Sequence, residues 1–234
     1  MSLTLLAIET CSEACSIALL IDGKVSQLVS NEPRGHADHV LPFVEKLLRQ
    51  ADISLKNLDA IAFTRGPGAF TGVRIGTSVA QGLALSSNLP LIAVSSLAVL
   101  AQTSYRHTDL THCIPALDAR MSEVYVGFYQ LDNNDCMVEL ENDQVAPALD
   151  IACSNEQNII AQSDHWQGYG PGWTNYPDQM QQRFSNWKVA YPEGLFFPEA
   201  LDLLTLAEAQ YQDGKLLDPA EAMPVYVRDK VVRG

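Results

Sequence analysis

The glycine-rich segment at residues 65–76, RGPGAFTGVRIG, is the stretch with the most chemical content. It lies between a predicted strand and a predicted helix. Glycines there let backbone amides approach a ligand, and the N-terminus of the following helix favours an anion such as phosphate. The segment is not a Walker loop, because GxxxxGK[ST] is absent. The alternative, that Gly66 and Gly68 only form a tight turn, stays open with about equal weight.

Carboxylates end two of the predicted strands, Glu9 in the first half of the chain and Asp118 in the second. In an α/β fold with two similar halves, carboxylates at such strand ends face the cleft between the halves, where they can orient a phosphate. The sequence therefore predicts a candidate nucleotide cleft made of Glu9, Thr10, Gly66, Gly68, Asp118, Arg120 and Glu123. The alternative is local, because Asp and Glu side chains also satisfy the amides of their own turns.

Histidine and cysteine patterns favour neither a metal site nor a nucleophile. His36 and His39 are three positions apart at a helix start, but a metal site needs a third ligand. Neither HExxH nor GxSxG occurs. The five cysteines include no CxxC pair, so we expect reduced, buried thiols. We expect no metal and no cofactor.

Two predicted helices, 36–51 and 72–86, carry a surface suited to docking. Small residues recur every four positions at Gly72, Gly76, Ala80 and Ala84, which makes a smooth stripe that another helix can approach closely. The alternative is packing on the chain's own sheet. We favour a second chain, because two helices exceed what one small sheet covers. The candidate interface is His36, Val40, Leu41, Val44, Leu47, Leu48, Gly72, Val73, Gly76, Val79, Ala80 and Leu83.

The elements that must position these residues follow a clear order. Strands are predicted at 3–8, 15–21 and 24–30, with a hairpin turn at Asp22-Gly23. A helix at 36–51, a strand at 58–64, the helix at 72–86, a strand at 91–94 and a helix at 95–105 follow. An antiparallel meander with right-handed crossovers makes a mixed sheet covered by helices. This α/β plan is that of the ribonuclease-H-like fold, half of an actin-like ATPase.

The second half repeats the meander in a reduced form. Strands are predicted at 113–117, 124–131 and 137–141, and the local pattern around Asp118 resembles that around Glu9, which suggests duplication. Residues 150–195 read as irregular, 198–211 as a helix and 224–227 as a short strand. We therefore expect two subdomains, each with a mixed sheet, at residues 1–106 and 107–234, the second one reduced.

Composition limits the classes of function. The chain has 234 residues, 47% of them hydrophobic, and no apolar run long enough to span a bilayer. Because its start has no basic leader, we expect a cytoplasmic protein without membrane contact. The net charge is −13, and residues 130–221 carry 3 basic and 16 acidic groups. Nucleic-acid affinity needs clustered Lys or Arg, so any contact with RNA would require a basic partner.

Four segments resemble the TsaB (YeaZ) family of tRNA threonylcarbamoyladenosine biosynthesis proteins. They are Leu6–Thr10, Arg65–Gly76, Asp118–Tyr125 and Pro224–Arg228, in order along nearly the whole chain. Many relatives have Asp, Gly and Ser where this chain has Glu9, Thr64 and Ala69, and these departures put only ligand detail in doubt.

The resemblance implies a non-catalytic subunit that pairs with the larger enzyme TsaD through helices 36–51 and 72–86, and with itself when alone. TsaD carries an HxxxH metal motif where this chain has Ser96 and Leu100, and Leu100 cannot bind a metal. The resemblance further implies a role in transfer of a threonylcarbamoyl group to the adenosine beside the anticodon. The ATPase TsaE is the implied third member, and tRNA is reached only through the complex.

Three other functions remain as alternatives. A metallopeptidase would need metal ligands, a kinase of the actin-like class would need a complete second ATP domain, and a homodimeric structural protein would need no other partner. Bound metal, ATP affinity and mixing with a TsaD-type subunit distinguish these cases.

Overall fold

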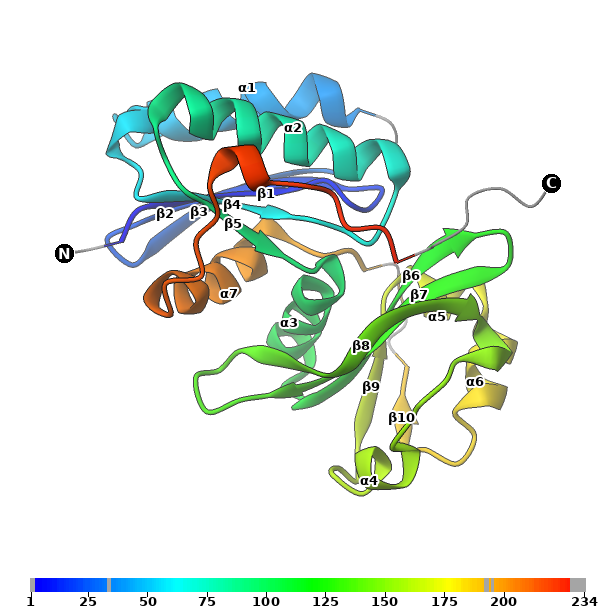
Figure 1. Ribbon diagram of the computed structural model, residues 1–234. Coiled ribbons are helices and arrows are strands. Elements are labelled where there is room, and N and C mark those ends of the chain that lie inside the picture. Colours follow the sequence, from blue (N-terminus) through cyan, green and yellow to red (C-terminus); the bar gives the residue numbers. More distant parts are fainter. Residues whose placement is uncertain (1–2, 33–34, 192–193, 195, 228–234) are drawn as a thin grey trace. The chain divides into compact units, whose positions relative to one another are not determined.

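The computed structural model describes residues 3–32, 35–191, 194 and 196–227. The chain forms two compact units (Figure 1). The first contains the described residues up to Val99 together with Pro198–Val225. The second contains those of Leu100–Phe197, with Tyr226 and Val227.

The first unit is built on a five-stranded mixed sheet of order β3-β2-β1-β4-β5. Its strands are β1 (Leu5–Glu9), β2 (Cys15–Ile21), β3 (Lys24–Ser30), β4 (Ala60–Thr64) and β5 (Leu91–Val94). β1 to β3 form an antiparallel meander, and β4 and β5 extend the sheet in parallel with β1. Asp22 and Gly23 both have positive φ in the β2–β3 turn, as the Asp-Gly pair predicts.

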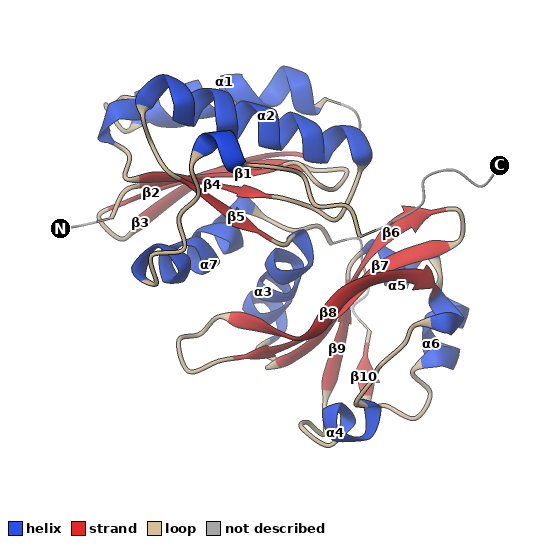
Figure 2. Ribbon diagram, viewed as in Figure 1, coloured by secondary structure: helices blue, strands red, loops and turns tan. Residues whose placement is uncertain are grey.

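Helices cover both faces of this sheet. α1 (His36–Gln50) and α2 (Phe70–Ser87) lie on one face and α7 (Ala200–Gln212) on the other (Figure 2). Short 3₁₀ turns, η1 (Leu55–Asn57) and η3 (Pro219–Glu221), complete the unit. The predicted boundaries, 1–106 and 107–234, therefore need correction. The buried apolar face of α7 packs on β1, β2 and β5, which returns this late helix to the first unit.

The second unit has a sheet of order β10-β9-β6-β7-β8. Its strands are β6 (His112–Arg120), β7 (Glu123–Leu131), β8 (Met137–Pro147), β9 (Trp166–Tyr169) and β10 (Val189–Ala190). Each of these strands occupies the position of its counterpart in the first sheet, with the same meander and parallel extension. The shared topology agrees with the predicted duplication and with two mixed sheets.

Residues 150–195, predicted to be irregular, contain regular elements. Besides β9 and β10 they hold α4 (Glu156–Ile160), α5 (Pro171–Asn175) and α6 (Pro177–Arg183), after η2 (Ala148–Asp150). Aromatic residues supply their core: Trp166, Trp173 and Trp187 are buried with Phe184. Large aromatic side chains bury much area each, so short elements suffice here.

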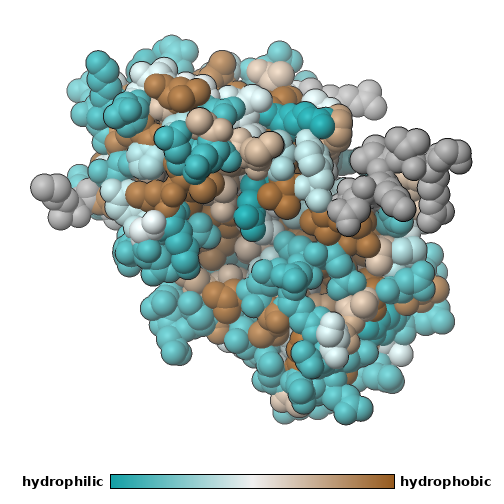
Figure 3. All heavy atoms as spheres, in the orientation of Figure 1, coloured by the Kyte–Doolittle hydropathy of each residue, from teal (hydrophilic) through white to brown (hydrophobic). Residues whose placement is uncertain are grey.

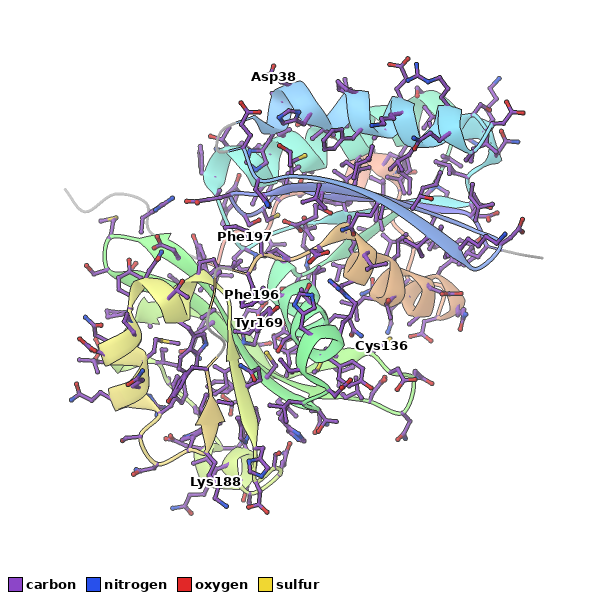
Figure 4. The ribbon with its side chains drawn as sticks, turned by 180° about the vertical axis from the view of Figure 1, so that it is seen from behind. Asp38, Cys136, Tyr169, Lys188, Phe196 and Phe197 are labelled. Carbon is purple, nitrogen blue, oxygen red and sulfur yellow. The ribbon has the colours of Figure 1, made fainter. Side chains whose placement is uncertain are left out.

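A second aromatic contact closes the region next to α3 (Ser96–Thr108). The rings of Tyr169 and Phe196 stack with centroids 4.8 Å apart (Figure 4), and the Tyr169 hydroxyl hydrogen-bonds His107 of α3. α3 is thereby attached to β9 in the second unit.

Two sequence expectations concern the end of the chain and the membrane. The short strand predicted at 224–227 does not form; instead Leu217 makes an isolated antiparallel bridge with Leu91.

Within the described residues, no helix combines the length and apolar character that crossing a bilayer requires. In Figure 3, hydrophobic residues are interspersed with hydrophilic ones over α1 and α2.

Candidate functional site

The glycine-rich loop between β4 and α2 packs on the chain itself. Gly66 has a φ of +97°, which favours glycine, and a Cβ there would lie 2.9 Å from the carbonyl oxygen of Val225. The Val225 amide donates a hydrogen bond of 2.8 Å to the Arg65 carbonyl, and the Ala69 amide donates one of 2.7 Å to Cys11. The loop is thus held by the turn after β1 and by the C-terminal segment.

The glycines of this segment meet the end of β1 rather than an open site. A Cβ on Gly68 would lie 2.1 Å from the Cys11 carbonyl oxygen, and one on Gly72 would lie 2.0 Å from the Thr10 carbonyl oxygen. A Cβ on Gly76 would lie 2.3 Å from Thr10 Oγ1, which donates to the Gly72 carbonyl at 2.8 Å. These contacts explain why glycine is needed at positions 68, 72 and 76, as a tight turn and a close approach require. Binding of an anion by the loop amides of Gly66 and Gly68 stays a prediction.

The stripe of small residues on α2 faces the chain's own sheet. Gly72, Gly76, Ala80 and Ala84 are all buried within this single chain. The expectation that the stripe forms a docking surface is therefore wrong for these residues. Small side chains are needed there because α2 approaches its own sheet closely, and the smooth surface serves that contact.

Glu9 is an ionisable group of the first unit with an unusual environment. Its side chain is completely buried; Oε1 accepts a hydrogen bond of 2.6 Å from the Cys11 amide, and Oε2 has no partner among the described residues. Burial raises the pKa of Glu9 to about 7, against the lowering effect of hydrogen bonds from Thr64, Cys11 and Ser12. A sealed acid of this kind is not an exposed phosphate or metal ligand.

The Asp118 carboxylate organises the hairpin between β6 and β7. It accepts hydrogen bonds from the Arg120 amide at 2.8 Å and its guanidinium at 2.9 Å. It also accepts from Asn175 at 3.2 Å and from the Tyr176 hydroxyl at 3.0 Å. The pKa of Tyr176 is raised mainly by burial and, to a smaller extent, by its hydrogen bond to Asp118. Asp118 thus satisfies an amide of its own turn, as the local alternative predicted.

The tip of that hairpin has an unusual backbone. Arg120, Met121 and Ser122 are consecutive non-glycine residues with φ between 56° and 62°, and Arg120 pairs with Glu123 across the turn. Such conformations cost about 1–3 kcal/mol each and persist only where surrounding contacts impose them. The Asp118 hydrogen bonds supply such contacts. A nucleotide cleft joining this hairpin with Glu9 stays a prediction.

The predicted interface residues of α1 and α2 divide into two groups. His36, Val40, Val44, Leu47, Leu48 and Val73 are buried with the stripe, whereas Leu41 is 51% exposed and Val79 and Leu83 are half-buried. Phe70 and Leu85, which are 58% and 59% exposed, were not among the predicted interface residues. A helical projection of α2 would have separated them from the small stripe. The exposed apolar side chains that remain are Leu41, Phe70 and Leu85, which we call the outer apolar face; Val79 and Leu83 pack in part against the core.

The histidines at the start of α1 have structural partners. His36 Nε2 lies 2.9 Å from the Ser12 carbonyl oxygen, and His39 Nε2 lies 2.9 Å from Glu32 Oε2. His39 also stacks on Phe43. In the part of the chain that the structure describes, no three His, Cys, Asp or Glu side chains gather as a metal site would require.

Ser96 and Leu100 of α3 are both inside the protein. The Ser96 hydroxyl donates a hydrogen bond to the Pro67 carbonyl, and Leu100 is fully buried. Ser96 thus serves the glycine-rich loop, and Leu100 serves the core.

Comparison with known proteins identifies the family. A family model described as "TsaD: tRNA N6-adenosine threonylcarbamoyltransferase" matches residues 25–191. The tRNA threonylcarbamoyladenosine biosynthesis protein TsaB of Escherichia coli (strain K12) is 39% identical, with 97% of this chain and 95% of the relative aligned. The TsaB protein of Haemophilus influenzae is 34% identical, with 98% of this chain and 95% of the relative aligned. YeaZ from Pseudomonas aeruginosa is similar in structure, with a TM-score of 0.86 and 42% identity over 96% and 99% of the two chains. The chain therefore belongs to the TsaB (YeaZ) family of tRNA threonylcarbamoyladenosine biosynthesis proteins.

Proposed function

We propose that this chain is a non-catalytic scaffold and activator of tRNA threonylcarbamoyladenosine synthesis, which pairs with a TsaD-type catalytic subunit and works with a TsaE-type ATPase in the cytoplasm. The observation that carries the proposal is the outer apolar face of α1 and α2, on a chain of the TsaB family. Exposed apolar side chains on neighbouring helices often mark protein interfaces.

The outer apolar face can offer anchors of several shapes. Leu41 comes from α1, whereas Phe70 and Leu85 come from the two ends of α2. The Arg74 guanidinium lies 3.3 Å from the centre of the Phe70 ring, so a cation covers one face of that ring. Aliphatic and aromatic anchors with an arginine beside them are typical of interface hot spots. The same face would serve self-pairing when the catalytic subunit is absent.

A non-catalytic role is supported by the fate of the candidate chemical groups. Glu9 is sealed, the glycines contact β1, and Ser96 holds the Pro67 carbonyl. The acidic composition of residues 130–221 disfavours direct binding of RNA phosphates. We therefore propose that tRNA binds mainly to the catalytic partner.

Reconstitution tests this function directly. A TsaD-type subunit with TsaE, ATP and tRNA is assayed with and without this chain, and threonylcarbamoyladenosine is measured by mass spectrometry of the digested tRNA. We expect modification only when this chain is present. Equal modification without it would overturn the activator role, and turnover by this chain alone would overturn the non-catalytic role.

A matched pair of variants locates the interface. Leu41→Asp places a charge in the outer apolar face, and Leu149→Asp places one at a similarly exposed leucine, 47% exposed in η2. We expect Leu41→Asp to weaken pairing at least about tenfold, since a desolvated charge in an interface costs more than about 1.4 kcal/mol. Leu149→Asp should pair normally. Unchanged pairing of Leu41→Asp would place the interface elsewhere.

A further inference from the structure

The turn after β1 contains a buried acid whose charge no described group neutralises. Glu9 Oε2 is shielded from solvent and has no hydrogen-bond partner among the described residues. An ionised carboxylate in that position would be shielded from bulk solvent and would have no counter-ion among the described residues, which is unfavourable. A neutral acid fits the site; Oε1 accepts from the Cys11 amide, and the bonds from Thr64 and Ser12 do not outweigh the burial.

The groups around Glu9 do not supply the missing positive charge. Cys11 and Cys15 are buried thiols whose pKa is raised by burial and by Glu9 itself. The other titratable or charged groups on the elements packed around this turn are Glu13, His36 of α1, Arg65 after β4, Arg74 of α2 and Asp202 of α7. Both arginines are exposed, and neither is among the causes that shift the pKa of Glu9. His36 faces the carbonyl oxygens of Ser12 and Ala14.

This turn is in direct contact with the start of α2. A Cβ at Gly72 would lie only 2.0 Å from the Thr10 carbonyl oxygen and one at Gly68 only 2.1 Å from that of Cys11, and the Ala69 amide donates a hydrogen bond to the Cys11 carbonyl. Contacts this close allow neither segment to shift without displacing the other. Hydration of an ionised Glu9 would displace residues 9–12, and the start of α2 would have to move with them.

We propose that Glu9 is a protonation switch, in which the neutral acid locks residues 9–12 onto the loop and first turns of α2, and its ionisation releases that contact. The inference is independent of the proposed function. It makes the local stability of one end of α2 respond to pH near neutrality.

The direction follows from linkage. The Glu9 pKa is about 7 in the closed state and takes its ordinary value, 4.5, once the turn opens to water. The closed state binds the proton more tightly, so the stability of the contact is complete below the ordinary pKa and is lost as pH rises toward the raised pKa. Between about pH 5.5 and about pH 8.5 the opening equilibrium should grow about 30-fold.

Hydrogen exchange of single amides in the full chain tests the switch. The Ala69 amide, which bonds to Cys11, reports on the turn, and the Trp173 amide, which bonds to Gly170 in the second unit, is the internal reference. Exchange rates divided by their intrinsic values should rise about 30-fold at Ala69 between those pH values, and stay constant at Trp173.

Two variants separate this effect from general loosening. Glu9→Gln is a permanently neutral counterpart and should abolish the pH dependence at Ala69, whereas Glu208→Gln, at an exposed position of α7, should keep it. A flat corrected rate at Ala69 in the unaltered protein would overturn the switch, and so would a 30-fold rise that persists in Glu9→Gln. Should Glu9→Gln fold poorly, the profile of the unaltered protein still decides.

Discussion

Replacing glycines of α2 one at a time tests how closely this helix approaches its own sheet. A Cβ added at Gly72 would lie 2.0 Å from the Thr10 carbonyl oxygen, whereas one added at Gly82 meets nothing within 4 Å. Both residues lie in the same helix, so Gly→Ala brings each a similar intrinsic gain of about 0.5–1 kcal/mol. The difference between Gly72→Ala and Gly82→Ala therefore measures the contact alone.

The size of that difference follows from the contact. The added carbon must move the Thr10 backbone or α2 by about 1 Å, and forced overpacking of this kind costs about 1–3 kcal/mol. The Thr10 hydroxyl also loses its 2.8 Å bond to the Gly72 carbonyl, worth about 1 kcal/mol. We expect Gly82→Ala to be up to about 1 kcal/mol more stable than the parent. Gly72→Ala should lie about 2–4 kcal/mol below Gly82→Ala.

Urea denaturation of the two variants, followed by tryptophan fluorescence and by circular dichroism, gives both free energies of unfolding. Equal stability of the pair within about 0.5 kcal/mol would refute the close approach and return the stripe to solvent. A bulky residue at Gly76 is likewise expected to destabilise the monomer.

Three further predictions concern ionic groups. Because the pKa of Glu9 is raised from 4.5 to about 7, the free energy of unfolding should fall by up to about 3 kcal/mol from low pH to about pH 8, and a flat denaturation profile would contradict this. Asp118→Ala should cost about 1–3 kcal/mol, whereas Asp164→Ala, at an 87% exposed side chain, should be neutral; equal urea midpoints would refute the hairpin argument. Arg183→Ala should cost about 2 kcal/mol by removing the guanidinium that bonds the Glu156 carboxylate and the Ile151 carbonyl, and Lys188→Ala, at an exposed pair, almost nothing; equal melting temperatures would contradict it.

The first unit was largely predictable because its elements have strong local signals. Alternating and continuous apolar runs located β1 to β5, and the Asp22-Gly23 pair fixed the hairpin. α1 has the apolar spacing of an amphipathic helix, with Val40, Val44 and Leu47 buried. The assignment of α7 failed for a different reason. Its pattern predicts a helix, but no local signal says which of two similar sheets a helix after β10 will cover.

Residues 150–195 were not predictable by the same means. α4, α5 and α6 are five to seven residues long, shorter than the window in which helical periodicity can be recognised. Their stability comes from long-range aromatic packing. The Trp173 indole, for example, donates a hydrogen bond of 2.7 Å to the Ile114 carbonyl oxygen. Tertiary contacts of this type leave no local trace in the sequence.

The candidate site shows why a sequence pattern can be recognised and still assigned to the wrong contact. Spacing every four residues establishes that Gly72, Gly76, Ala80 and Ala84 share a face of α2, but does not say what that face meets. The decisive information is three-dimensional: the Thr10 and Cys11 carbonyl oxygens fill the space above the glycines.

Burying the small stripe has a consequence for the outer apolar face. A helix that approaches its sheet through glycines and alanines buries little apolar area at those positions, and some of its larger side chains lie on other faces. Phe70 and Leu85 project outward, where each remains more than half exposed. Leaving such side chains in water forgoes about 25 cal/mol per Å² that a partner could recover. The close contact with β1 is therefore compatible with docking, because the same geometry that hides the stripe holds the outer apolar face away from the sheet.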